Sequence, residues 1–207
     1  MSEQKHRADL PLLLLVTGLP GTGKSTLARR LAPALGLPLI ARDDLKESLF
    51  ETLGWSTVEW SQKLGRATYA LVYLLMERLL AARCSLLVET PFDPAFANAR
   101  FQQLQQRTPF QPVQVQLSTR PDVLVQRYAQ RVDSGERHPG HVDRLRMGDF
   151  DPEALAQRNR PLDIGGALIA IDTTDFAALD FDGLVAQIDA LRRGPPQRPE
   201  QRESAGE

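Results

Sequence analysis

The sequence predicts an α/β protein in which helices cover both faces of a five-stranded parallel sheet. Short apolar runs of strand length alternate with longer segments of helical spacing along the 207 residues, as in a doubly wound sheet. A glycine-rich turn separates the first apolar run from the first helical segment. An apolar fraction of 42% at this length is sufficient for one domain with its own core.

Each element follows from apolar spacing, caps and breakers. Ser56 with Glu59 forms a capping-box signal that opens the longest helix, and Gly36 ends the first helix, which Pro33 kinks or shortens. The expected strands are 12–16, 37–40, 85–89, 113–117 and 167–171. The expected helices are 24–35, 43–53, 56–82, 93–107, 121–133 and 181–192, with short ones near Asp143 and Asp151.

Two of these segments carry a more detailed expectation. In the longest helix, leucines with helical spacing mark the apolar face. These are Leu71, Leu74, Leu75, Leu79 and Leu80. In the fourth strand Val113, Val115 and Leu117 alternate with glutamines, which predicts one wetter face.

The ends of the chain and its charge limit the possible functions. Residues 1–9 are polar and are expected to be flexible, residues 194–207 have almost no apolar content and are expected to be disordered, and residues 10–193 form the domain. No segment approaches transmembrane length. The net charge of −1 gives no case for a membrane surface or a long nucleic-acid groove. One cysteine, Cys84, fits a reducing cytoplasm.

Residues 18–25 fit the phosphate-binding pattern G-x-x-x-x-G-K-[ST] between a strand and a helix. Gly18, Gly21 and Gly23 let the backbone curl so that its N–H groups point at phosphate oxygens. Lys24 adds a charge for the outer phosphates, and Ser25 offers a hydroxyl to Mg²⁺. Pro20, Thr22 and Thr26 complete the predicted nucleotide-binding loop. An ordinary glycine-rich turn is the alternative.

Other motifs narrow the class. No N-K-x-D guanine-reading motif is present, and the third strand ends in Val88-Glu89-Thr90, without the paired acids of motor ATPases. The chain resembles a loose family of small P-loop kinases that includes phage polynucleotide kinase, zeta toxins and chloramphenicol phosphotransferase. The resemblance covers about residues 12–175 and includes Arg42-Asp43-Asp44-Leu45-Lys46. It implies a P-loop NTPase fold like that of nucleoside-monophosphate kinases, with an arginine-bearing lid at about 121–160.

The resemblance also implies roles for single residues. Asp43 would be the general base, Lys46 an acceptor ligand, and Glu89 an acidic residue near Mg²⁺, possibly through water, or near the acceptor. Arg131, with Arg127, would lie on the ATP phosphates. The phage enzyme has Arg where this chain has Lys46. An arginine can bind an acceptor phosphate through two hydrogen bonds, whereas the lysine ammonium offers a point charge.

The residues themselves support part of this assignment. A carboxylate at a strand end beside the phosphate loop, such as Asp43, can reach both a γ-phosphate and an incoming hydroxyl. A helix cap or a ligand to Mg²⁺-bound water is the alternative, and Asp44 is the better cap candidate. Arg127 and Arg131 share a helix face at spacing i, i+4, where a solvated basic face is the alternative.

Further candidates surround this group. Arg42 and Arg137 are placed with the acceptor-binding residues, and Phe92 either floors an acceptor pocket or packs in the core. His138 and His141, three apart, suggest Zn²⁺ only with Asp143, because no cysteine or third histidine supports them. A lid loop or a plain exposed loop explains them better.

We therefore expect a cytoplasmic phosphotransferase that uses ATP and Mg²⁺ and acts on a hydroxyl acceptor. A small molecule (nucleoside, sugar, antibiotic or nucleotide sugar) suits the near-neutral charge, and a polynucleotide 5′-hydroxyl suits Arg42-Asp43-Asp44. A nucleotide-switched binding protein or slow ATPase, and a zeta-type toxin kinase with a partner antitoxin, are the alternatives. The sequence leaves the oligomeric state open.

Overall fold

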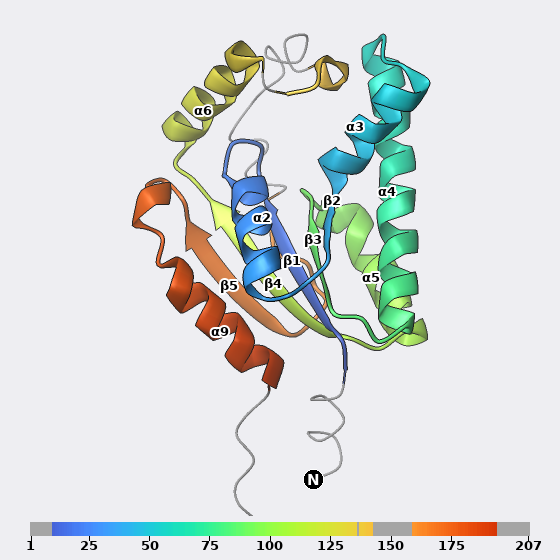
Figure 1. Cartoon of the computed structure of the whole chain (residues 1–207), viewed down its shortest axis with the longest axis vertical. Coiled ribbons are helices and arrows are strands. Elements are labelled where there is room, and N and C mark those ends of the chain that lie inside the picture. The colour runs from blue at the N-terminus through green and yellow to red at the C-terminus, as the bar shows by residue number, and fades with distance from the viewer. Residues whose placement is uncertain (1–9, 136, 143–158, 194–207) are drawn as a thin grey trace, which may run out of the picture.

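The computed structural model describes residues 10–135, 137–142 and 159–193. Five strands form one sheet in the order β2-β3-β1-β4-β5, and all four neighbouring pairs are parallel. This confirms the predicted sheet (Figure 1). The strands are β1 (Leu12–Gly18), β2 (Leu39–Ala41), β3 (Leu86–Glu89), β4 (Gln111–Ser118) and β5 (Ala167–Asp172).

Helices cover both faces of the sheet (Figure 1). They are α2 (Lys24–Ala34), α3 (Arg42–Leu53), α4 (Val58–Ala81), α5 (Pro94–Arg107), α6 (Pro121–Ser134) and α9 (Phe181–Arg193), with 3₁₀ turns η1 (Pro139–His141) and η3 (Phe176–Ala178). Pro33 lies inside the last turn of α2, and Gly36 follows it with φ +62°. None of these helices is long and apolar enough to cross a bilayer.

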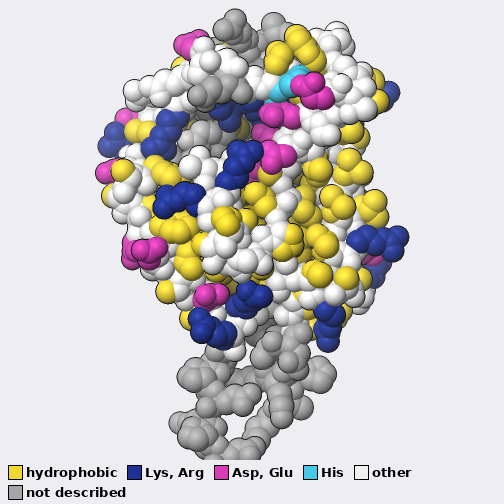
Figure 2. Space-filling view, in the orientation of Figure 1, with side chains coloured by type: hydrophobic (Ala, Val, Ile, Leu, Met, Phe, Trp, Pro, Cys, Tyr) yellow, Lys and Arg dark blue, Asp and Glu magenta, His cyan; other side chains and the backbone are white. Residues whose placement is uncertain are grey.

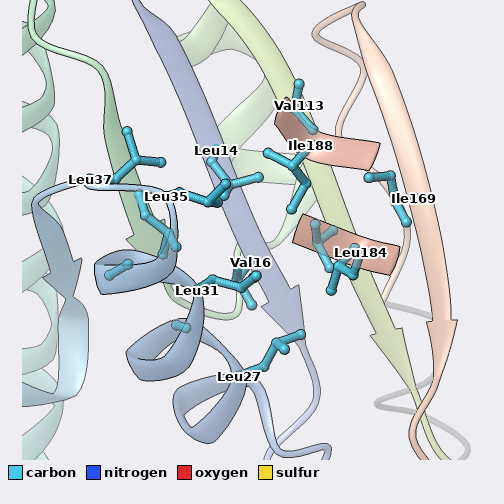
Figure 3. Packing of buried hydrophobic residues seen from close by; sticks show 14 of the residues in the cluster. Leu14, Val16, Leu27, Leu31, Leu35, Leu37, Val113, Ile169, Leu184 and Ile188 are labelled. Carbon is cyan, nitrogen blue, oxygen red and sulfur yellow. The ribbon is translucent and has the colours of Figure 1, made fainter. Parts of the chain in front are cut away.

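The two faces of the sheet carry separate hydrophobic cores because successive side chains of β1 point to opposite sides. Leu14 and Val16 pack on one side with Leu31 of α2 and Ile188 of α9 (Figure 3). Leu13 and Leu15 pack on the other side, against buried side chains of α4 and α5. The central strand is therefore buried on both faces, which explains its unbroken run of leucines.

The start of α4 differs by one residue from the prediction. Thr57, not Ser56, is the N-cap, and its side chain accepts a hydrogen bond from the Trp60 amide at 3.2 Å. Either hydroxyl residue can cap a helix, so the spacing to Glu59 alone could not distinguish them.

The leucines that indicated the helix α4 do not all lie on its buried face. Leu80 is buried, but Leu71, Leu74 and Leu75 are exposed. The buried face carries Leu64, Thr68, Val72 and Met76. Small and polar residues on this face made its periodicity weaker than that of the leucines.

The predicted wetter face of β4 is wrong. Gln114 and Gln116 are buried because the segment before β5 covers them and accepts hydrogen bonds from both side-chain amides. Gln114 donates to the Leu162 carbonyl at 2.9 Å and accepts from the Leu162 amide at 2.8 Å. Gln116 donates to the Asn159 side chain at 2.5 Å. Buried amides are tolerated when they are hydrogen-bonded in this way.

Some expectations concern residues outside the described ranges. These are the flexible start at 1–9, the tail at 194–207, and the part of the lid that contains the helices expected near Asp143 and Asp151.

Candidate functional site

The site lies at the carboxyl edge of the sheet, where β1, β2 and β3 end beside one another. Val16 of β1 and Ala41 of β2 are both in register with Glu89, the last residue of β3. Basic and acidic side chains gather in this upper part of the molecule, whereas many of the hydrophobic side chains on view lie lower (Figure 2). Ligands of open parallel sheets bind at this edge.

The phosphate loop connects β1 to α2 and requires its glycines. Gly21 and Gly23 have φ angles of +90° and +83°, which disfavour any residue with a side chain. A Cβ on Gly23 would also lie 2.7 Å from the ring of Phe176. The buried Thr22 holds the turn by donating to the Leu19 carbonyl at 2.8 Å.

The start of α2 is suited to an anion. Gly23 is its N-cap and offers no side-chain acceptor, and no acidic residue lies in the first turn. The amides of this turn are therefore available, and they lie at the positive end of the helix dipole. Ser25 is half-buried and Thr26 is exposed.

Lys24 and Glu89 form a buried pair in the centre of the site. The Lys24 Nζ lies 3.8 Å from the Glu89 Oε1, and both side chains are almost fully enclosed. Burial lowers the pKa of Lys24 and raises the pKa of Glu89, because desolvation outweighs their attraction. Ser25 also donates a hydrogen bond to the Glu89 carboxylate. The pair is thus suited to stronger counter-charges: a polyphosphate for Lys24 and a cation for Glu89.

Asp43 lies in the first turn of α3, directly after β2. Its carboxylate accepts from Arg137 at 2.5 Å and from Arg42 at 3.2 Å. Burial alone would raise its pKa, but the charges of Arg137, Arg42 and Lys24 outweigh burial and hold the pKa of Asp43 well below its ordinary value. Asp43 is therefore a charged carboxylate at neutral pH, close to the phosphate loop.

Asp44, the expected cap of α3, is not the N-cap. That position is Ala41, which has no side-chain acceptor. Asp44 instead accepts from Arg29 of α2 at 2.6 Å, in an exposed pair. The neighbouring carboxylates Asp43 and Asp44 thus have separate surroundings, one in the site and one on the surface.

The two arginines of α6 also have different surroundings. Arg127 donates to the carbonyls of Thr173 and Thr174 at 2.8 and 3.0 Å, which ties α6 to the segment after β5. Arg131 lies over the Tyr128 ring at 5.2 Å, and its charge is among those that lower the pKa of Lys24, after the larger effect of burial. The charge of Arg131 therefore acts at the phosphate loop.

Arg42 and Lys46 lie where α3 faces α4. The Lys46 ammonium is buried and donates to the Ser61 hydroxyl at 2.9 Å. The Arg42 guanidinium lies 4.5 Å from the centre of the Tyr69 ring. Both residues line a cavity of about 250 Å³ between the two helices.

Phe92 belongs to the core, which was the alternative to an acceptor pocket. Its side chain is buried in the core cluster on the α4 and α5 face. Its ring centre lies 5.0 Å from that of Phe101 and 6.0 Å from that of Tyr73. Phe92 therefore packs in the core and does not line the cavity between α3 and α4.

His138 and His141 fasten the segment after α6 to α3. The His138 ring stacks on Phe50 with centres 5.1 Å apart, and its Nε2 lies 3.0 Å from Glu51. The buried His141 contacts Glu47 at 2.9 Å. The two rings thus bind different carboxylates, and Asp143 lies outside the described residues. Within those residues no group of three His, Cys, Asp or Glu side chains could hold a metal ion.

The sequence reasoning missed this contact surface on α3. Phe50 and Glu51 follow Glu47 by three and four residues, so each lies on the same side of α3 as Glu47. An aromatic residue between two acids at this spacing is a weak signal, and nothing local identifies the histidines as its partners.

Comparisons with known proteins agree with the fold. Residues 13–150 match the model of a protein family described as an AAA domain. The solved structure of a putative kinase from Chloroflexus aurantiacus J-10-fl is 34% identical, with a TM-score of 0.78 over 87% of this chain and 97% of that one. A sugar kinase from Janibacter sp. HTCC2649 is 15% identical, with a TM-score of 0.53 over 86% and 92% of the chains, which shows a shared fold. No curated protein matches the chain.

Proposed function

The chain belongs to the AAA domain family, and we propose that it is a kinase that transfers the γ-phosphoryl group of ATP to the hydroxyl of a small molecule. The observation that carries the proposal is the convergence of Lys24, Asp43 and Glu89 at one edge of the sheet. The charges of both Asp43 and Glu89 act on the Lys24 ammonium. The likeness to a putative kinase over 87% of the chain supports it further.

The residues present fit a magnesium nucleotide. The glycine turn leads into the start of α2, where no side-chain cap and no acidic residue compete with a phosphate for the backbone amides. Ser25 and Glu89 together supply a hydroxyl and one carboxylate, which is the small donor set that Mg²⁺ accepts when phosphates complete its shell. Mg²⁺ bound there would neutralise charge on the phosphates.

Asp43 is the proposed general base. Its carboxylate takes the proton of the acceptor hydroxyl, the freed oxygen forms a bond to the γ-phosphorus, and the bond from that phosphorus to the β-γ bridging oxygen breaks. ADP leaves with the electron pair of that bond. A base with a low pKa suits a loose transition state, in which the proton leaves late and positioning matters most.

Arg131 and Arg137 are the proposed cations for the transferred group. Charge spreads over the phosphoryl oxygens in the transition state, and guanidinium groups stabilise it there. The charges of both arginines act on Lys24, which is expected for side chains facing the same phosphates. Arg127, whose guanidinium binds two carbonyls, has the proposed role of positioning α6.

Arg42 and Lys46 are the proposed acceptor ligands, because both line the cavity between α3 and α4 and Arg42 also contacts Asp43. A volume of about 250 Å³ corresponds to roughly eight water molecules at about 30 Å³ each. That size favours a small molecule over a stretch of nucleic acid.

The test is a screen for ADP release by the full chain with Mg·ATP. Nucleosides, sugars, nucleotide sugars, aminoglycosides and 5′-hydroxyl oligonucleotides are compared as acceptors. We expect one class of small molecule to accelerate ADP release and to become phosphorylated, with little dependence on salt. Oligonucleotides as the best acceptors, with activity that falls steeply as salt rises, would overturn the small-molecule proposal. ATP binding with no acceptor in any class would favour a nucleotide-switched protein.

A further inference from the structure

The cavity between α3 and α4 has a one-sided charge. Its lining includes Arg42 and Lys46 from α3 and Arg66 from α4, and none of the described residues that line it is acidic. Uncharged polar groups of Ser61, Gln62 and Tyr69 complete much of the wall. The lining thus brings three basic side chains to one small space, and one of them, Arg42, also contacts Asp43.

Two of these cations are withdrawn from water. Lys46 is 6% exposed, and the Arg42 side chain is 15% exposed. The Nε–H of Arg42 is buried and has no hydrogen-bond acceptor among the described residues. A buried donor on a charged group is expensive to leave unsatisfied, and an oxyanion in the cavity would satisfy it.

Gly65 indicates that the helix opposite makes room for these groups. It lies in the interior of α4, where glycine is less favourable than alanine. A Cβ at this position would lie 3.1 Å from Arg42 Nη2 and 3.8 Å from Lys46 Nζ. The absence of a side chain thus leaves space around the two charged tips.

The positive field extends to the neighbouring lid contact. Burial and then the charges of Arg137, Lys46 and Arg42 lower the pKa of His141 to about 3, although Asp43 acts in the other direction. At His141 the charge of Asp43 is therefore outweighed by burial and these cations together.

We propose that the acceptor is a small alcohol that already carries an oxyanion, a carboxylate or a phosphate, which binds Arg42, Lys46 and Arg66. Arg42 contacts Asp43 directly, so an acceptor anchored there has its hydroxyl near the base. This inference rests on the proposed kinase function, because it assigns the cavity to the acceptor.

The test measures binding by calorimetry to the full chain saturated with Mg·ADP, so that the phosphate loop is occupied. The probes are matched sets: glycerol, glycerate and glycerol 3-phosphate, and glucose, gluconate and glucose 6-phosphate. We expect a carboxylate or a phosphate member to bind at least tenfold more tightly than its neutral parent. The member that binds identifies which oxyanion the site takes.

Variants of cavity residues test whether the preference for anionic probes arises in the cavity. Lys46→Met and Arg66→Gln should reduce the preference to threefold or less. Lys63→Gln removes a charge from the same helix outside the cavity and should retain it. Because Arg66 is exposed, its substitution tests the site even if the Lys46 variant folds poorly.

The inference would be overturned if the neutral parents bind as tightly as the anions, or if no anion binds. It would also be overturned if the Lys46 and Arg66 variants keep the preference of the wild type. None of these results needs phosphoryl transfer, so the two proposals fail separately. A chain that binds oxyanions but phosphorylates none loses the kinase function alone. A chain that phosphorylates neutral alcohols as efficiently as anionic ones loses the oxyanion site alone.

Discussion

Arg137 donates to the Asp43 carboxylate at 2.5 Å across 94 positions of sequence. This contact joins the segment after α6 to the first turn of α3. The same segment holds α3 through the stack of His138 on Phe50 and through His141 on Glu47. The segment after α6 therefore positions the carboxylate of the proposed base, Asp43, and keeps it ionised by lowering its pKa.

Arg137→Gln should move the acid limb of the pH profile of kcat/KM to higher pH. The positive charge of Arg137 holds the pKa of Asp43 low, so without it the carboxylate protonates at higher pH and the base is lost earlier. The measurement is kcat/KM from pH 8 down to the lowest pH at which both proteins stay folded, because the wild-type limb lies below 3.8, the ordinary pKa of an aspartate. Arg120→Gln, which removes an exposed arginine paired with Asp122, is the control and should leave the profile unchanged. An unmoved acid limb in Arg137→Gln would show that the contact does not persist in solution.

His141→Gln should flatten the pH dependence of stability between pH 6.5 and about 3. The folded protein holds His141 neutral down to about pH 3, whereas an unfolded histidine protonates near 6.5. In this window the unfolded state binds more protons, so the free energy of unfolding of the wild type falls as pH is lowered. Urea unfolding at pH 7, 5.5 and 4.5 measures it. Equal slopes for wild type and variant would contradict the burial of a neutral His141.

Gly140→Ala should loosen the contact between the segment after α6 and α3. A Cβ at this position would lie 2.7 Å from the Phe50 ring, and overpacking of this kind costs about 1–3 kcal/mol. Urea unfolding should show this loss, and the KM of the acceptor should rise. In the Phe50→Leu background the same substitution should cost less, because the smaller side chain can yield. Equal costs in both backgrounds would indicate that the two residues do not touch.

The sequence carries most of the fold because its signals are local. The glycine turn at 18–25 and the apolar run of β1 each lie where the structure uses them. The surroundings of Gln114 could not be predicted in this way. Its burial depends on Leu162, 48 positions away, and alternation with valine describes an exposed face equally well.

The candidate site also contains residues that the sequence could predict and residues that it could not. Lys24, Asp43 and Glu89 could be placed together because parallel strands end at one edge of the sheet. Arg137 could be assigned to the site, but its contact with Asp43 could not be predicted. That contact depends on how the segment after α6 packs on α3. Arg66 was missed because an exposed arginine on a long helix looks like part of a solvated face.

The central claim is that Asp43 removes the proton from the acceptor hydroxyl at a nucleotide held by the phosphate loop. The direct measurement compares Asp43→Asn with Asp44→Asn, for phosphoryl transfer to the acceptor found in the screen and for Mg·ATP affinity by calorimetry. We predict that Asp43→Asn lowers transfer by about 10²–10⁴-fold and leaves the Kd of Mg·ATP within about threefold, while Asp44→Asn behaves like the wild type. Transfer that persists at the wild-type rate in Asp43→Asn would contradict the account.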